Sequence, residues 1–475
     1  MTFHPTRDLG DLFVALHAAH LTQDGKIISD AELNEPPAAV LERYLAEREA
    51  PEFSLAAFFE KHFVLPEPPQ SGFEADPDGT VSEHIERLWS ALTRPAETRN
   101  ERWSSRIPLP HPYVVPGGRF NEIYYWDSFF TMLGLRVSGK VELIRGMLDN
   151  FAHLIEEHGH IPNGNRTYFL SRSQPPFFAQ MVRLLMEMEG EHVLETYRPA
   201  LEREYEFWCG GTDNPRVIEV NGVRLNRYYD NEAAPRAEMY QDDVELLERG
   251  GSDAEQLLLD IRAACESGWD FSSRWCADPL DLATLRTTDL LPVDLNCLLL
   301  DLERLLGLET GREAAIRELF WNPTTDYFHD YDHRTGQLTE RFTLAGIFPL
   351  YFRVASVDQS FGCAKTVRTH FLAEGGVQTT DTASGQQWDA PNGWAPLQYL
   401  TIEGLANYGH SEFADQIRTR WLTLNEAVFQ RTGKMMEKYN VADTSLESGG
   451  GEYDNQEGFG WTNGVYLALK EAVRS

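Results

Sequence analysis

Apolar residues recur every three or four positions along most of this chain, the spacing that places them on one face of an α-helix. Strict alternation of apolar and polar residues, which indicates half-buried strands, is rare. One local hairpin is expected over residues 217–225, around Asn221-Gly222. The predicted helices after residue 80 span residues 81–92, 126–137, 141–158, 176–189, 194–209, 254–267, 292–306, 312–320, 362–372, 395–408, 411–429 and 462–473. The predicted fold class is therefore all-α.

The connections between these helices are rich in Gly, Pro and Trp and contain most of the chemically distinctive residues. This distribution favours one α-helical toroid whose loops form a cleft at one end, because functional groups gather on loops that a rigid scaffold holds. Two stacked domains are the alternative, although no low-complexity linker divides the chain.

Residues 9–65 show a separate pattern of short helices, for example over 11–20 and 38–48, and this stretch ends at Pro66-Glu67-Pro68-Pro69. Five apolar residues would lie mainly on one side of a helix: Phe53, Leu55, Phe58, Phe59 and Phe63. We therefore expect residues 1–70 to form a helical arm that packs on a barrel formed by residues 71–475, within a single domain overall.

The composition is that of a globular protein, with 475 residues of which 42% are hydrophobic and 24% charged. The formal net charge of −32 repels nucleic acid and anionic membranes, so neither is an expected partner. The chain has no apolar run of roughly 18 residues, and its start lacks a basic region followed by an apolar stretch. From these features we expect a cytoplasmic protein.

The five cysteines are scattered and include no CxxC pair: Cys209, Cys265, Cys276, Cys297 and Cys363. Their spacing does not match a zinc site, and we expect reduced, half-buried thiols. No cluster of His or Asp has the spacing of metal ligands, so neither a metal nor another cofactor is expected.

The segment from Pro116 to Asp127, PGGRFNEIYYWD, brings an arginine, two tyrosines, a tryptophan and an aspartate together after a glycine turn. Aromatic planes cover the apolar C–H faces of sugar rings, and guanidinium and carboxylate groups bind the hydroxyl edges with paired hydrogen bonds. The mixture indicates a carbohydrate site. The alternative is that the aromatic residues belong to a buried core.

A second segment, residues 386–396, carries Trp388 and Trp394 on a turn-forming frame, either as stacking platforms or as a buried aromatic turn. In a third, Asn163, Arg172 and Gln174 offer amides and a planar guanidinium that suit vicinal hydroxyls. Arg172 and Gln174 could instead cap the helix expected from residue 176.

Arg236 and Glu238 form another pair of this kind, although such a pair in isolation is more often a surface salt bridge.

Asp270 is the candidate general acid. A carboxylic acid that donates a proton near neutral pH needs a raised pKa, and the neighbouring Trp269, Phe271 and Trp275 could provide the desolvation that raises it. Alternatively, Asp270 caps a helix or pairs with Arg274.

Glu437 is the candidate general base, because a glutamate beside Lys438 is expected to stay ionised; it could equally be an ordinary solvated residue. Glu452 follows the three glycines 449–451. A run of glycines costs backbone entropy, which is typical of a ligand contact or an unusual turn.

Taken together, these segments resemble the α,α-trehalases of glycoside hydrolase family 37. Residues 116–127 match the pattern PGGRF-x-E-x-YYWD, and residues 387–396 match QWD-x-P-x-GWAP. The resemblance extends from the N-terminal arm to the segment GFGWTNG at residues 458–464, so it covers nearly the whole chain.

The resemblance implies a single (α/α)6 barrel with an N-terminal extension packed on it. It also implies hydrolysis of trehalose to two glucose molecules with inversion, by a protein expected to be a monomer. Asp270 would be the general acid and Glu437 the general base. The implied substrate contacts are Arg119, Trp126, Asp127, Asn163, Arg172, Ser173, Gln174, Arg236, Ala237, Glu238, Gly268 and Glu452. Glu452 would lie on a loop, residues 449–453, that covers the bound disaccharide.

Three positions depart from the family pattern: Ala237 replaces a common proline, Ile123 an aromatic residue and Asn440 an aspartate. They affect the expected affinity for substrate more than the reaction type. In this mechanism the nearby arginines favour ionised carboxylates, so Asp270 must depend on its aromatic neighbours or on the charge of Glu437 to stay protonated. Two rival functions are a phosphorylase or a glucosidase for another disaccharide, and a sugar-binding protein without catalysis.

Overall fold

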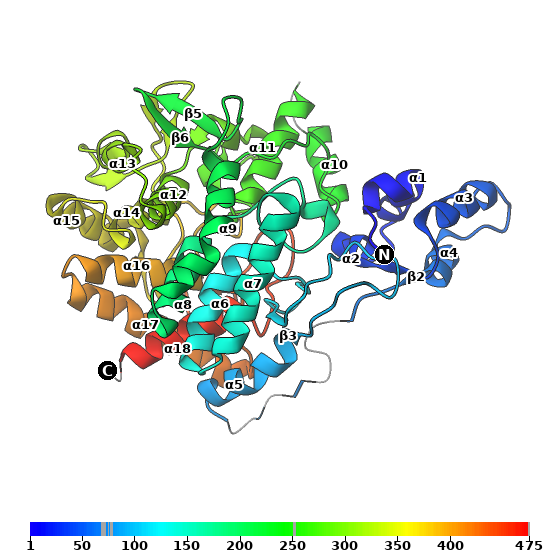
Figure 1. Ribbon diagram of the computed structural model, residues 1–475, viewed down its shortest axis with the longest axis horizontal. Helices are drawn as coiled ribbons and strands as arrows, with labels where there is room; N and C mark the ends of the chain where they lie inside the picture. The colour runs from blue at the N-terminus through cyan, green and yellow to red at the C-terminus, as the bar shows by residue number, and fades with distance from the viewer. Residues whose placement is uncertain (68–72, 75, 77–78, 250–252, 474–475) are drawn as a thin grey trace.

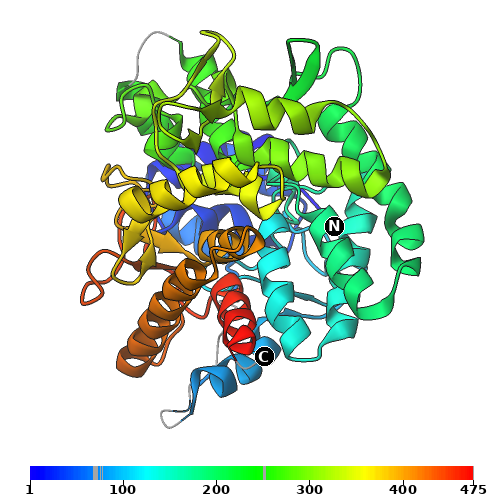
Figure 2. The same cartoon turned by 90° about the vertical axis from the view of Figure 1, so that its left-hand side faces the viewer.

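The structure is a computed structural model that describes residues 1–67, 73–74, 76, 79–249 and 253–473. Within these residues, six helices form a closed inner ring in which each contacts the next. They are α6 (Tyr125–Val137), α8 (Phe178–Glu189), α12 (Val293–Leu306), α14 (Phe348–Tyr351), α16 (Ala395–Asn407) and α18 (Gly460–Ala472). The ring closes where α18, red in Figure 2, packs along α6, which is cyan.

An outer helix precedes each inner helix along the chain. The outer helices are α5 (Val81–Leu92), α7 (Val141–His158), α9 (His192–Cys209), α13 (Arg312–Leu319), α15 (Val357–Thr366) and α17 (Ser411–Thr432). Two further helices, α10 (Tyr240–Arg249) and α11 (Ala254–Glu266), lie between α9 and α12 in the sequence. Alternation of inner and outer helices around a closed ring is an (α/α)6 barrel, which confirms the predicted fold class.

The strands are short antiparallel pairs in the connections. They are β1 (Glu32–Leu33) with β2 (Phe63–Val64), β3 (Thr93–Arg94) with β4 (Tyr113–Val114), β5 (Val217–Val220) with β6 (Val223–Asn226), β8 (Trp321–Asn322) with β9 (Tyr327–Phe328), β12 (Leu372–Ala373) with β13 (Gly376–Val377), and β14 (Asn392–Trp394) with β15 (Lys438–Asn440). A three-stranded sheet has the order β11 (Gln337–Leu338), β10 (Tyr331–Asp332), β7 (Leu290–Leu291). The hairpin β5–β6 confirms the one expected around Asn221-Gly222.

Most helix boundaries agree with the periodicity to within a few residues, but α15 begins five residues before the expected helix at 362. Ser356 and Gln359 form a capping box: the Ser356 side chain accepts from the Gln359 backbone, and the Gln359 side chain accepts from the Ser356 backbone. This cap satisfies backbone N–H groups at the first turn of α15, and the helix therefore begins at Val357.

The N-terminal arm is visible in blue at the right of Figure 1. It consists of α1 (Pro5–Ala18), α2 (Gly25–Asp30), α3 (Pro37–Glu47) and α4 (Leu55–His62). Phe58, Phe59 and Phe63 pack in an apolar cluster that is largely the arm's own, and this cluster reaches the barrel through Tyr124 and Phe169. The arm therefore packs on the barrel. The predicted boundary at residue 70 lies outside the described residues.

In the described part of the chain, none of the helices has the length and apolar character needed to cross a membrane.

Candidate active site

The connections between the helices form a pocket that is partly open to solvent. Its walls come from segments that are distant in sequence, including the start of α6, the loop after α7, the segment before α10 and the end of α11. The sequence-predicted residues on its wall are Arg119, Trp126, Asp127, Asn163, Arg172, Gln174, Arg236, Glu238, Gly268, Asp270, Glu437 and Glu452. The fold thus brings both proposed catalytic carboxyl groups into one site.

Two predicted substrate contacts, Ser173 and Ala237, are not among the lining residues. The Ser173 hydroxyl donates to the carbonyl of Ile161 over 2.6 Å, and its backbone N–H donates to Glu266 over 2.9 Å. The carbonyl of Ala237 accepts a hydrogen bond from the Ser29 hydroxyl in α2 over 2.6 Å. The contacts that these two residues make in the structure therefore hold pocket segments in place.

Asp270 follows a tight turn at Gly268, whose φ of +72° favours glycine; a Cβ there would lie 2.9 Å from the Trp126 ring. Burial raises the pKa of the Asp270 carboxyl to about 7, and the negative charge of Glu452 adds to this effect. The sequence had suggested Glu437 as the neighbouring charge, but Glu452 is the carboxylate with the larger influence. A carboxyl group with this pKa can donate a proton near neutral pH.

Arg274 does not hold Asp270. Its guanidinium donates to both oxygens of Asp294 at 2.8 Å and to those of Asp330 at 2.8 and 2.9 Å, deep in the interior. The loop that follows Asp270 is anchored by Asp389, which accepts hydrogen bonds from Ser272 and Ser273. The loop is thus fixed by other groups, and the Asp270 side chain itself faces the pocket.

Glu437 directly precedes β15, which pairs with β14 so that Trp394 lies opposite Lys438. One oxygen of its carboxylate accepts from the Tyr453 hydroxyl over 2.9 Å, and the other lies 3.3 Å from the Lys438 ammonium. Only 1% of Glu437 is exposed. It is therefore a buried, oriented carboxylate and not an ordinary solvated residue.

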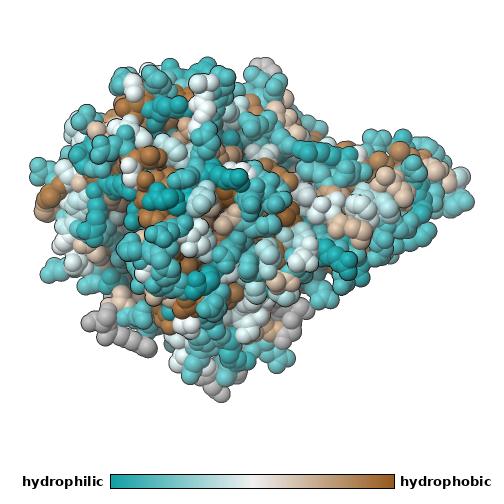
Figure 3. Space-filling model, viewed as in Figure 1, coloured by the Kyte–Doolittle hydropathy of each residue, from teal (hydrophilic) through white to brown (hydrophobic). Residues whose placement is uncertain are grey.

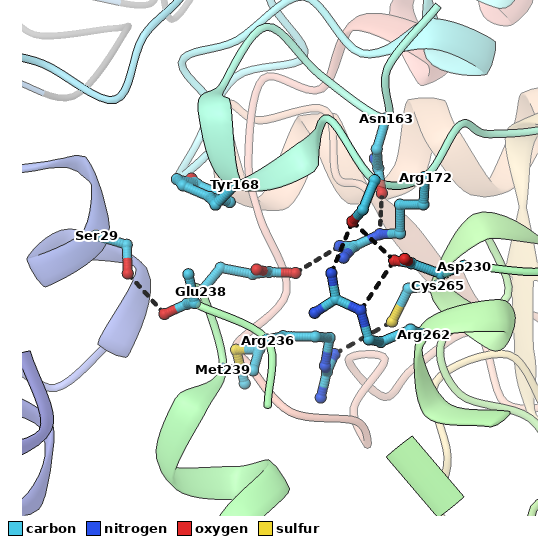
Figure 4. A network of polar contacts seen from close by, with 12 residues as sticks. Ser29, Asn163, Tyr168, Arg172, Asp230, Arg236, Glu238, Met239, Arg262 and Cys265 are labelled. Atoms are coloured by element: carbon cyan, nitrogen blue, oxygen red, sulfur yellow. Dashed lines mark hydrogen bonds and ion pairs between the residues drawn. The ribbon is translucent and has the colours of Figure 1, made fainter. Parts of the chain in front are cut away.

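Arg172, Arg236 and Glu238 line the pocket and belong to a network of polar contacts (Figure 4). Arg172 donates to Glu238 over 2.5 Å and to Asn163 over 3.0 Å, and Arg236 donates to Glu452 over 2.8 Å. Burial alone would raise the pKa of Glu238, but the charges of Arg172 and Arg236 outweigh it and lower the pKa to about 2. Arg236 and Glu238 therefore do not form the surface salt bridge considered for them, because each pairs with another residue at the pocket: Glu238 with Arg172, and Arg236 with Glu452.

Three polar atoms in this pocket lack a hydrogen-bond partner among the described residues: Nη1 of Arg172, Oε2 of Glu238 and Nε of Arg119. Buried polar atoms without a partner are costly. Two donors and one acceptor on a pocket wall match the hydrogen-bonding capacity of a polyhydroxylated ligand.

Asp127 also lines the pocket, and its pKa is raised well above the usual range by burial and then by the charges of Glu437 and Asp270. Trp388 stacks on Trp394 with ring centroids 3.9 Å apart, and both rings reach the pocket wall. The rings are therefore buried, as the buried-turn interpretation expects, and their use as a stacking platform for a sugar stays a prediction.

Several lining residues were not predicted as site residues: Phe120, Tyr124, Phe169, Met239, Cys265, Tyr453, Phe459 and Trp461. Phe459 and Trp461 lie in the GFGWTNG segment, whose match to the family pattern was the available signal. Phe169, Met239 and Cys265 belong to no motif noted in the sequence, and only the folding of their segments around the pocket identifies them.

The model of the trehalase family matches residues 20–473. The chain belongs to the trehalase family. Periplasmic trehalases from Escherichia coli O139:H28 (strain E24377A / ETEC) and O17:K52:H18 (strain UMN026 / ExPEC) are each 43% identical to it over 492 residues, covering 98% of this chain and 86% of the relative.

Among solved structures, neutral trehalase Nth1 from Saccharomyces cerevisiae matches with a TM-score of 0.65 at 25% identity, covering 84% of this chain and 82% of that one. A GH63 mannosylglycerate hydrolase from Thermus thermophilus matches with a TM-score of 0.55 at 17% identity, covering 82% and 100%. The second likeness shows a shared fold alone.

The expectation of a cytoplasmic trehalase is wrong, since these curated relatives are named periplasmic. The five cysteines, which we expected to be reduced and half-buried, are unpaired and fully buried. Burial raises the pKa of the Cys209 thiol to about 11 and that of Cys276 to about 12. Buried thiols of this kind are unreactive in oxidising and reducing compartments alike, so they do not indicate location.

Proposed function

We propose that this protein hydrolyses α,α-trehalose to two glucose molecules with inversion, with Asp270 as general acid and Glu437 as general base. One observation carries the proposal. Two carboxyl groups line the same pocket in different environments: Asp270 has a pKa raised to about 7, and Glu437 is paired with Lys438. Two carboxyl groups whose environments differ in this way are the arrangement that acid and base roles require.

In this mechanism the Asp270 carboxyl gives its proton to the oxygen that bridges the two glucose rings. Glu437 accepts a proton from a water molecule, which attacks the anomeric carbon from the opposite face. The C–O bond to the leaving glucose breaks as the bond to water forms, so one product is released as β-glucose and the other as α-glucose. Both carboxyl groups then exchange protons with solvent and return to their starting states.

Substrate binding is assigned to the polar groups of the wall. Arg119, Arg172 and Glu238 each have a polar atom without a partner among the described residues, and these atoms would pair with sugar hydroxyls. Trp126, Trp388 and Trp461 would cover the C–H faces of the rings.

We also propose that the protein works as a monomer in the periplasm, without a cofactor and without binding nucleic acid. The location is supported by the names of the relatives, and the lack of nucleic-acid binding by the net charge of −32. Closure of the loop at residues 449–453 over the substrate stays a prediction.

The test is to follow the anomers of glucose by proton NMR during hydrolysis of trehalose in phosphate-free buffer. Equal initial amounts of α- and β-glucose are expected. Asp270→Asn and Glu437→Gln should each lower kcat by roughly 10²- to 10⁴-fold, because each removes one proton-transfer step.

Turnover only with phosphate would instead indicate a phosphorylase. Cleavage of another disaccharide but not trehalose would indicate a related glucosidase. Binding of sugars without any turnover would indicate a binding protein.

A further inference from the structure

Gln387 lies between the segments that carry the two proposed catalytic carboxyl groups. Its Nε2 donates to the backbone carbonyl of Asp270 over 2.5 Å, and its Oε1 accepts from Nζ of Lys438 over 2.9 Å. Nζ of Lys438 in turn lies 3.3 Å from Oε2 of Glu437. One amide side chain therefore connects the acid segment and the base segment.

The surroundings of Gln387 leave its side chain little freedom. Only 1% of the residue is exposed, and its own carbonyl accepts from Nε1 of Trp394 over 3.0 Å and from Nδ2 of Asn392 over 3.1 Å. On its other side lies Gly451, where a Cβ would lie 2.8–2.9 Å from the Gln387 side chain. The glycine run before Glu452 thus allows that loop to pass directly over Gln387.

Lys438 has an equally constrained position. None of its side chain is exposed, and its ammonium lies over the rings of Trp394 at 5.2 Å and Tyr453 at 5.1 Å. Its ammonium donates hydrogen bonds to Gln387 and Glu437. Without Gln387, one of the two groups that hold this ammonium is lost, and Glu437 loses the fixed partner on its Oε2 side.

An inverting hydrolase needs its two carboxyl groups held about 6.5–9.5 Å apart, so that the attacking water fits between the base and the sugar. A displacement of about 1 Å can cost roughly 100-fold in rate. A rigid link between the two segments would maintain this separation. Gln387 is not among the pocket-lining residues, so this contribution would come from positioning and not from contact with the substrate.

We infer that Gln387 is a positioning residue, which fixes the separation and relative orientation of Asp270 and Glu437 through the Asp270 carbonyl and Lys438. The inference rests on the proposed function. Gln387 is the first residue of the QWD segment, and this inference gives it a role in catalysis that is separate from the stacking of Trp388.

Gln398 provides a matched control. It is also a fully buried glutamine with both amide atoms hydrogen bonded, accepting from the N–H of Val377 over 2.9 Å and donating to its carbonyl over 2.6 Å. Both contacts go to one residue of β13, and Gln398 does not line the pocket. Its loss removes buried hydrogen bonds without disconnecting the catalytic segments.

The experiment measures kcat, KM and the thermal midpoint for Gln387→Met, Gln387→Glu and Gln398→Met with trehalose. Gln387→Met is expected to lower kcat by roughly 10- to 100-fold with KM within about threefold of wild type, since ground-state binding is retained and only the reacting geometry is lost. Gln398→Met should keep kcat within about threefold of wild type, even if its thermal midpoint falls as much as that of Gln387→Met.

Gln387→Glu keeps the acceptor for Lys438 but has no donor for the Asp270 carbonyl, and kcat should fall at least about fivefold. This variant decides the question if Gln387→Met does not fold. The inference is overturned if the folded Gln387 variants keep wild-type kcat, if only KM rises, or if Gln398→Met loses as much kcat. Lack of trehalose turnover by the wild-type protein would refute the proposed function itself, which separates the two failures.

Discussion

At the scale of single residues, the proposed role of Asp270 as general acid predicts how activity depends on pH. The acid must carry a proton to donate it, so kcat/KM should fall as pH rises through its pKa of about 7. Glu452 contributes to that raised pKa through its negative charge. Glu452→Gln removes the charge and should therefore move the alkaline limb of the pH profile to lower pH.

The measurement is the pH dependence of kcat/KM for wild type and Glu452→Gln, with Glu313→Gln as control. Glu313 is also paired with arginines, but it lies on α13 outside the pocket. A limb that stays in place in Glu452→Gln, or one that moves equally in both variants, would show that Glu452 does not tune the acid.

At the scale of elements, helix α2 of the arm reaches a pocket residue. Asp24 caps α2 by accepting from the Lys26 N–H over 2.9 Å, and it also accepts from Arg119 over 2.6 Å. Asp24→Asn retains a good cap but weakens the charge-assisted bond to Arg119. We expect KM for trehalose to rise about three- to tenfold and stability to change by less than about 1 kcal/mol.

Asp253→Asn is the matched control, because Asp253 caps α11 in the same way, accepting from the Gln256 N–H, and does not line the pocket. Its KM should equal that of wild type. An unchanged KM in Asp24→Asn would mean that the arm does not contribute to substrate binding.

The contact between α6 and α18 closes the barrel, and it depends on small residues. A Cβ at Gly464 would lie 2.0 Å from the carbonyl oxygen of Phe130. Gly464→Ala must therefore push the two helices apart, and we expect it to lower the free energy of unfolding by about 1–3 kcal/mol or more, as overpacked cores do. Denaturant unfolding measures this loss.

Gly449→Ala is the comparison, because a Cβ there meets nothing within 4 Å. Equal stability of the Gly464→Ala variant and wild type would show that the helices separate without cost.

At the scale of the whole molecule, the net charge of −32 opposes compactness by self-repulsion. Hydrophilic residues cover most of the face shown in Figure 3. Salt screens such exposed charges, so the thermal midpoint should rise when NaCl is increased from about 0.02 to about 0.5 M. Because trehalose is neutral, kcat/KM should change by less than about twofold over the same range.

A thermal midpoint that does not change with salt would mean that repulsion between the acidic groups does not lower the stability of the folded protein. A strong salt dependence of kcat/KM would indicate that charge acts at the pocket itself.

Helical periodicity is a local property, and it was sufficient to predict the all-α class and most helix boundaries. The Gly, Trp and carboxylate motifs likewise indicated the sugar site, because residues adjacent in sequence carry the chemistry. The sequence left open whether Asp270 pairs with Arg274, and the structure shows Arg274 bound to Asp294 and Asp330.

Other features were decided only by tertiary structure. The contact of Asp24 with Arg119 and that of Gln387 with Asp270 join residues about 95 and 117 positions apart. Such pairings depend on how all the helices close into a ring, and no local pattern encodes them. The sequence thus determined the fold class and the chemical groups of this trehalase family member, while the barrel determined which of those groups meet.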